Sequence, residues 1–118
     1  MSYATLAGFT VMRDPMGTAV HYTPPIAREA LNATFSVETT HYYSSGPGAV
    51  VVTVQHKDFA DTSWAVADTF ANITGTGVDT LTVADLKEEI RLKFGFSIGG
   101  AAFDLAHLVV AAPAWLPE

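Results

Sequence analysis

The sequence predicts an all-β protein, namely an antiparallel β-sandwich with a jelly-roll-like arrangement of about seven to nine strands. Apolar and polar residues alternate over several stretches, and this period of two is typical of strands with one buried face. Turn-forming residues separate these stretches at the spacing found in sandwich proteins. No amphipathic helix of ordinary length is evident. We therefore expect two antiparallel sheets that pack face to face.

The clearest alternation covers residues 86–98. Every second residue belongs to a mostly apolar series, which consists of Leu86, Glu88, Ile90, Leu92, Phe94, Phe96 and Ile98. The pattern predicts a long strand with one apolar and one charged face. A rival interpretation is a short helix that begins with a capping box of Thr82 and Asp85 and runs to Arg91. The strand is favoured because the alternation continues past Arg91.

The first half of the chain predicts an N-terminal arm, about residues 1–12, that leads into a short strand. Asp, Pro and Gly between residues 13 and 17 favour a turn. Pro24 and Pro25 end a further strand because proline cannot donate to a β-ladder. Gly and Pro residues predict a loop over 42–48. The strands expected in this half are 6–12, 18–23, 31–41 and 49–56.

The second half predicts shorter strands before residue 86 and one long strand after it. Gly99 and Gly100 favour a hairpin turn into the last strand. A C-terminal tail follows, and its apolar residues would either order on a neighbouring subunit or pack back onto the last strand. The expected segments are strands 64–69, 70–73, 78–83 and 101–112, and the tail 113–118.

The composition fits one domain, residues 1–118, with an unusual shortage of charge. Hydrophobic residues make up 49% of the chain and charged residues 15%, whereas soluble domains typically have about 25% charged residues. An apolar surplus of this kind indicates protein–protein contacts, and we expect a homo-oligomer. The alternative is that small residues such as Ala inflate the hydrophobic count.

Charge and residue content argue against several functions. The net charge is −6, and the six basic residues form no run, which is unfavourable for nucleic-acid binding. No apolar stretch is long enough to span a membrane. The chain has no cysteine, so disulfides and zinc–thiolate sites are excluded. The N-terminus does not resemble a signal peptide, so we expect folding in a cytoplasm.

No catalytic, cofactor-binding or metal-binding residue is predicted. The four histidines lack the spacing of metal ligands, and the acids lack the pattern of a calcium loop. Glu88 and Glu89 are adjacent, so on a strand they point to opposite faces and do not form a catalytic pair. The chain has neither a Gly-x-Ser-x-Gly elbow nor a phosphate loop. We therefore expect a protein that is not an enzyme and has no cofactor.

Aromatic residues near predicted loops and termini are the candidate interaction residues. Exposed aromatic side chains can stack on sugar rings or bury themselves in a protein partner. For Trp64 the alternative is a core tryptophan of the sandwich. The candidates are Tyr42, Tyr43, Trp64, Trp115 and Leu116.

Four segments in order carry a resemblance: 50–58 (VVVTVQHKD), 61–64 (DTSW), 70–74 (FANIT) and 86–91 (LKEEIR). Together they resemble small β-sandwich proteins of tailed bacteriophages, which are encoded among head and virion structural genes. In those proteins a strand ending in Gln-His precedes a loop with Asp-Thr and Trp, and a Leu-Lys-x-x-x-Arg segment follows. The resemblance covers roughly residues 49–94 and carries no catalytic residues.

The resemblance implies a non-enzymatic virion structural protein, a capsid decoration or cement protein, that is assembled in the host cytoplasm. Its expected partners are the major capsid protein or other virion subunits. The alternative is a carbohydrate- or calcium-binding module, used in host attachment, with a loop platform of Tyr42, Tyr43 or Trp64.

Overall fold

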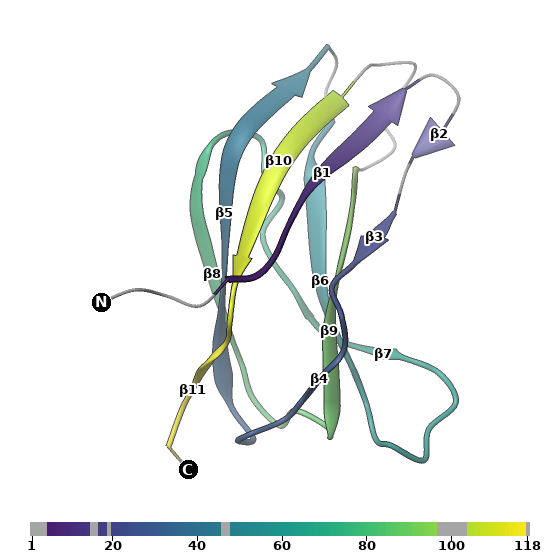
Figure 1. Cartoon of the computed structure of the whole chain (residues 1–118), viewed down its shortest axis with the longest axis vertical. Coiled ribbons are helices and arrows are strands. Elements are labelled where there is room, and N and C mark those ends of the chain that lie inside the picture. The colour runs from purple at the N-terminus through teal and green to yellow at the C-terminus, as the bar shows by residue number, and fades with distance from the viewer. Residues whose placement is uncertain (1–4, 15–16, 19, 46–47, 97–103, 118) are drawn as a thin grey trace.

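The computed structural model is a sandwich of two antiparallel sheets (Figure 1). It describes residues 5–14, 17–18, 20–45, 48–96 and 104–117. Over these ranges every regular element is a strand, and none is a helix long and apolar enough to cross a membrane. The predicted all-β sandwich is confirmed, while the jelly-roll-like topology remains a prediction.

The first sheet, sheet A, has β5 and β10 at its centre. Its edges are β8 on one side and β1 on the other. Two short strands extend it: β11 continues along β5 after β10 ends, and β2 pairs with the end of β1. The bounds are β1 Thr5–Asp14, β2 Gly17–Thr18, β5 Ala33–Ser44, β8 Gly77–Val83, β10 Asp104–Ala111 and β11 Ala114–Trp115.

The second sheet, sheet B, has β6 and β9 at its centre. β7 lies beside β6, while two short strands, β3 and β4, share the other side of β9. The bounds are β3 His21–Tyr22, β4 Ile26–Ala27, β6 Val50–Lys57, β7 Ala65–Thr69 and β9 Glu89–Phe96. Seven strands of the described ranges have five or more residues, and four have two.

β9 has the alternation that its sequence predicts. Ile90, Leu92 and Phe94 are fully buried and Phe96 is nearly so, whereas the residues between them are half-buried. Burial of each such side chain stabilises the fold by about 1.5–3 kcal/mol. The strand is shorter than predicted: it begins at Glu89, and residues beyond Phe96 lie outside the described ranges.

The segment between β8 and β9 forms neither the predicted strand start nor the rival helix. Asp85 has a φ of 56° and therefore turns the chain immediately after β8. Leu86 follows this turn and is buried, and its backbone N–H donates to the carbonyl of Leu31 at 2.8 Å. The rival helix is therefore wrong, because a left-handed residue interrupts it, and the long strand begins at Glu89 and not at Leu86.

The core lies between the inner faces of the two sheets. Sheet A and sheet B contribute alternate residues of their central strands, as the period of two requires. Residues of the connecting segments complete it. Its members are Ala33, Phe35, Val37, Val50, Val52, Val54, Phe70, Ile73, Val83, Leu86, Ile90, Leu92, Phe94, Phe96, Ala106, Leu108 and Val110.

Several predicted boundaries change because of pairing between distant strands. The predicted strand 6–12 is confirmed as part of β1, which is longer (Thr5–Asp14) because β10 pairs with it along this length. β5 extends through Tyr42 and Tyr43 to Ser44, so these tyrosines belong to a strand and not to a loop. The predicted strand 70–73 is reduced to a single bridge between Ile73 and Val50.

Candidate functional site

The five candidate interaction residues do not form one site. Tyr42 and Tyr43 lie near the end of β5, whereas Trp115 and Leu116 lie beside the start of the same strand. Trp64 precedes β7, on the other sheet (Figure 1). The structure therefore separates them into three places.

Tyr42 and Tyr43 point to opposite faces of β5. Tyr42 packs against the core, its ring centroid lies 6.4 Å from that of Phe96, and its hydroxyl donates to the carbonyl of Gly48. Tyr43 is 55% exposed. Tyr42 is thus mainly a structural residue that holds the chain after β5, and Tyr43 is the one available to a partner.

The C-terminal tail packs back onto its own domain. Trp115 lies opposite Ala33 in the β11–β5 ladder and packs against the core. The N–H of Leu116 donates to the carbonyl of Asn32 at 3.0 Å. Of the two explanations for this apolar tail, packing within the chain is the observed one, although the contact is with the start of β5 and not with the last long strand.

Trp64 is not the core tryptophan of the sandwich. It is half-buried on the outer face of sheet B, outside the core cluster. Its ring stacks on two cations: the Cζ of Arg91 lies 4.4 Å, and the Nζ of Lys57 5.5 Å, from the ring centroid. Such cation–π contacts contribute about 0.5–1 kcal/mol at exposed sites.

Arg91 is the centre of this arrangement. Its Cζ lies 4.1 Å from the ring centroid of Tyr22, which precedes the turn into β4, so the guanidinium contacts two aromatic rings. Its Nε donates to the Oε1 of Gln55 at 2.8 Å, directly across the β6–β9 ladder. We call Tyr22, Gln55, Lys57, Trp64 and Arg91 the Arg91 cluster.

Ionic contacts hold the loop 58–64 against sheet B. The Nζ of Lys57 forms a salt bridge with Glu89 at 3.2 Å and donates to the carbonyl of Asp61 at 3.2 Å. The Asp61 carboxylate lies 3.8 Å from the Nζ of Lys87 and accepts from the N–H of Asp58. Each exposed pair contributes at most about 1 kcal/mol, but together they define the position of the loop that ends in Trp64.

A hydrogen bond with the backbone of the same loop explains the position of the Glu88 side chain. Its carboxylate accepts from the N–H of Phe59 at 3.1 Å, so it lies at the surface and not within the apolar series where the alternation had placed it. The side chain of Arg28 donates to the carbonyl of Leu86 and not to Glu88.

His56 lies at the end of β6 beneath this loop. Its Nδ1 accepts the backbone N–H of Lys87 at 3.2 Å, which requires an unprotonated Nδ1. Burial lowers the pKa of His56 from 6.5, the Lys87 charge lowers it further, and Asp58 partly opposes both. His56 is therefore held neutral as a hydrogen-bond acceptor.

Three of the four segments that carry the resemblance meet at this place. Gln55 and His56 come from the first segment, Trp64 from the second and Arg91 from the last, and each contacts another segment. Trp64 was among the candidate residues predicted from the sequence, whereas Tyr22, Gln55 and Arg91 were not. The available signal was that Gln55 and Arg91 both occupy the outward register of their strands.

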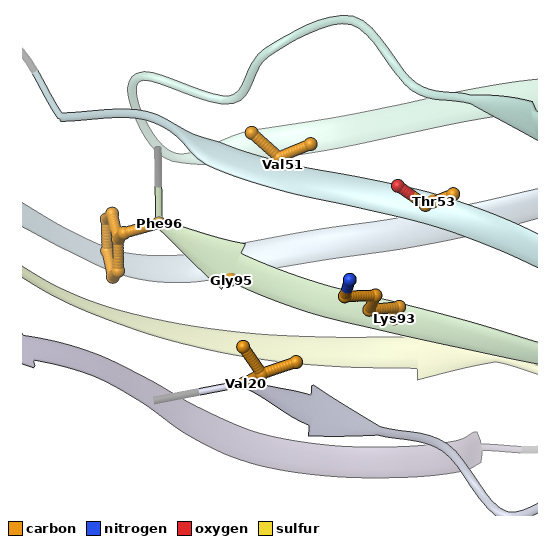
Figure 2. A pocket seen from close by; sticks show the side chains of 6 residues that line it. All are labelled: Val20, Val51, Thr53, Lys93, Gly95 and Phe96. Carbon is orange, nitrogen blue, oxygen red and sulfur yellow. The ribbon is translucent and has the colours of Figure 1, made fainter. Parts of the chain in front are cut away.

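A shallow pocket of about 210 Å³ lies further along the same face (Figure 2). It opens where β6, β9 and the residue before β3 lie side by side. Because Gly95 is a glycine and has no side chain, the centre of the pocket is open. Lys93 and Thr53 provide its polar edge. The lining residues are Val20, Val51, Thr53, Lys93, Gly95 and Phe96.

The histidines and acids of the described ranges form no group of three or more that is placed to hold a metal ion. His41 and His107 lie opposite each other on β5 and β10, with ring centroids 6.3 Å apart. No protein-family model matches the chain, and no curated protein matches it. The function proposed below therefore rests on the side chains that the surface of this structure exposes.

Proposed function

We propose that this chain is a non-enzymatic virion structural protein that decorates or cements a phage capsid through protein–protein contacts. The supporting observation is the Arg91 cluster, which presents Trp64, Tyr22 and Arg91 together on the outer face of sheet B. These three residue types are the ones most enriched at the energetic centres of protein interfaces. All members of the cluster except Tyr22 come from the segments that resemble virion structural proteins of phages.

The cluster is already ordered in the free chain. Arg91 is held by two rings and by Gln55, and the loop that ends in Trp64 is held by Lys57 and Lys87. Side chains that are immobilised before binding lose less entropy when a partner arrives. A preorganised aromatic and cationic surface therefore favours a permanent contact.

Exposed apolar side chains surround the cluster. In the described ranges, seven large hydrophobic residues are exposed, and four of them belong to sheet B or its loops. Because isolated apolar residues are common on any surface, their concentration near one face is the informative feature. The four are Tyr22, which belongs to the cluster itself, and Val20, Phe59 and Val66 around it.

The edges of sheet A provide a route to a homo-oligomer. β8 pairs with β5 along Gly77–Val83, and no strand of the described ranges pairs with its other side. An open edge presents backbone donors and acceptors that a second chain can complete. The proposed partners are thus the major capsid protein or other virion subunits and further copies of this chain, within the virion after assembly in the host cytoplasm.

The alternative, a carbohydrate- or calcium-binding module, has less support. Its expected platform carries Tyr42, Tyr43 or Trp64, but Tyr42 packs against the core and Trp64 stacks on two cations, so only Tyr43 is left with an open ring. A sugar needs an open aromatic face. We therefore rank this function second.

The test is sedimentation of the protein with virus particles. A lysate of the source is fractionated on a density gradient and the protein is followed by mass spectrometry. We expect migration with large particles at high copy number, and confinement to the slow soluble fractions would rule out a stable virion component.

A variant then tests the Arg91 cluster itself. Arg91→Lys keeps the charge but loses the planar group that stacks between two rings, so we expect at least a tenfold lower copy number on particles. Glu38→Gln, on the exposed face of the central strand β5, is the control and should bind as the wild type does. Circular dichroism and thermal melting check that both variants fold.

A further inference from the structure

The outer face of sheet B has a regular pattern of side chains along β9. Outward residues recur at every second position, and each lies opposite an outward residue of β6. From one end to the other the cross-strand pairs are Glu89 with Lys57, Arg91 with Gln55, Lys93 with Thr53, and Gly95 with Val51. The face therefore changes from charged and aromatic to apolar along a single line.

The apolar end is the pocket of about 210 Å³. Val20 and Val51 form its sides, and Gly95 leaves the space between them open (Figure 2). A water molecule occupies about 30 Å³ of the liquid, so the pocket has room for a branched aliphatic side chain.

The adjacent cations have unused hydrogen-bond donors. The side chain of Lys93 has no hydrogen bond or salt bridge with any residue that the structure describes, and the side chain of Arg91 donates to those residues only through its Nε. Lys57, in contrast, is paired with Glu89. Two cations thus stand beside an apolar pocket on a chain whose net charge is −6.

We propose that this face binds an acidic, extended peptide segment of a partner protein. An apolar side chain of the segment occupies the pocket, and two carboxylates reach Lys93 and the terminal nitrogens of Arg91. This inference rests on the proposed function, because it names the chemistry of the virion segment to which the protein attaches.

The spacing of the sheet defines the motif. Side chains on the same face of an extended chain recur about every 6.6–6.8 Å, both in β9 and in a peptide laid along it. On β9, the pocket lies at Gly95, Lys93 lies one such interval away from it, and Arg91 lies two intervals away. The matching segment is apolar–x–acidic–x–acidic.

The chain does not contain this motif. Its twelve acidic residues include no pair separated by a single residue. A second copy therefore cannot supply both carboxylates in the required register, and a different protein must. A nucleic acid is also disfavoured, since two cations on an acidic protein make few phosphate contacts.

Fluorescence anisotropy with a labelled peptide tests the proposal on the full chain. The probe has the sequence SVSESES, and the control SVESESS has the same composition with both acids in the register that faces away. We expect saturable micromolar binding of the probe and at least tenfold weaker binding of the control. Replacing the valine of the probe with serine should also weaken binding.

Two variants with the same change in net charge identify the site. Lys93→Gln removes the unpaired cation, and we expect about tenfold weaker binding of the probe. Arg28→Gln removes a cation that is not on the line and whose side chain donates to the Leu86 carbonyl, and it should change the affinity less than twofold. Equal losses from the two variants, or equal affinity for the two peptides, would show general charge attraction and overturn the proposal.

Two further outcomes would also overturn it. One is no saturation with up to about 1 mM peptide. The other is a dimer in sedimentation equilibrium that Lys93→Gln dissociates, because the face would then bind a second copy.

The outcomes separate this inference from the proposed function. If the protein binds the probe through Lys93 but does not sediment with particles, only the virion role fails. If it sediments with particles, and Lys93→Gln changes neither that nor any peptide binding, only the inference fails.

Discussion

Thr23 and Thr39 are both buried, but they differ in whether the side-chain hydroxyl has a hydrogen-bond partner among the described residues. The hydroxyl of Thr23 accepts the backbone N–H of Leu92 at 2.9 Å, and its own N–H donates to the Leu92 carbonyl at 2.9 Å. Thr23 therefore extends the β3–β9 pairing at the point where the prolines interrupt it. Thr39 occupies the inward register of β5, and its buried hydroxyl has no partner among the described residues.

We predict opposite outcomes for replacing these threonines with valine, which has the same shape. Thr39→Val removes an unsatisfied polar group, so the free energy of unfolding should stay equal or rise by up to about 1 kcal/mol. Thr23→Val leaves the Leu92 N–H buried without an acceptor and should cost about 1–3 kcal/mol. Urea unfolding monitored by circular dichroism measures both. A loss for Thr39→Val as large as for Thr23→Val would mean that the Thr39 hydroxyl has a partner.

His56 should make stability depend on pH. In the unfolded chain this residue titrates near 6.5, and its pKa in the folded chain is lower. The unfolded chain therefore binds more protons in this window, and the stability contributed by neutral His56 is fully present above pH 6.5 and is lost as the pH falls through the folded pKa. His56→Asn keeps an acceptor for Lys87 but does not titrate.

The measurement compares urea midpoints of the wild type and His56→Asn at pH 8 and at pH 5.5. We expect the wild type to lose more stability than the variant on acidification. If both lose the same amount, protonation of His56 does not act on the fold. Other groups that titrate in this range contribute equally to both proteins and cancel in the comparison.

At the scale of elements, β11 shows how two residues attach a terminus. Ala114 and Trp115 pair with Thr34 and Ala33, after Pro113 has interrupted β10. Pro113 cannot donate to the ladder, so the pairing stops and resumes beyond it. The Trp115 side chain covers one end of the core.

Removal of residues 113–118 should therefore destabilise the isolated domain. Loss of a large apolar side chain from the core boundary should cost about 2 kcal/mol or more, measured by urea unfolding of the truncated chain. Trp115→Ala in the full chain should give most of this loss. A truncated chain of unchanged stability that no longer oligomerises would instead show that the tail belongs to a neighbouring subunit.

At the scale of the whole molecule, the two outer faces have different chemistry. On sheet A, the described part over β5 and β8 exposes mainly hydroxyl groups, and those of Thr34 and Thr82 lie 2.9 Å apart. On sheet B, cations, aromatic rings and the pocket follow the β6–β9 pair. An attachment through sheet B would leave the hydroxyl face of sheet A toward solvent and its edges open to other copies.

Much of the candidate site could not be predicted, for a reason visible in its own contacts. Trp64 was identified as a single residue, but its partner Arg91 was assigned to a solvated strand face. Gln55 and Arg91, whose side chains form a hydrogen bond, are 36 residues apart in the sequence. Which residue of β6 lies opposite Arg91 depends on the register of β6 and β9, and a shift of one residue would turn Gln55 to the other face.

The sequence by itself determined which residues of β5, β6 and β9 are buried, because alternation is a local property of an extended backbone. It therefore predicted the all-β sandwich and its central strands. The tertiary structure decided the rest: the pairing of β1 and β11, the turn at Asp85, and the meeting of Tyr22, Trp64 and Arg91. These depend on contacts between residues far apart in the chain, and the energy of such contacts appears only when both sheets have formed.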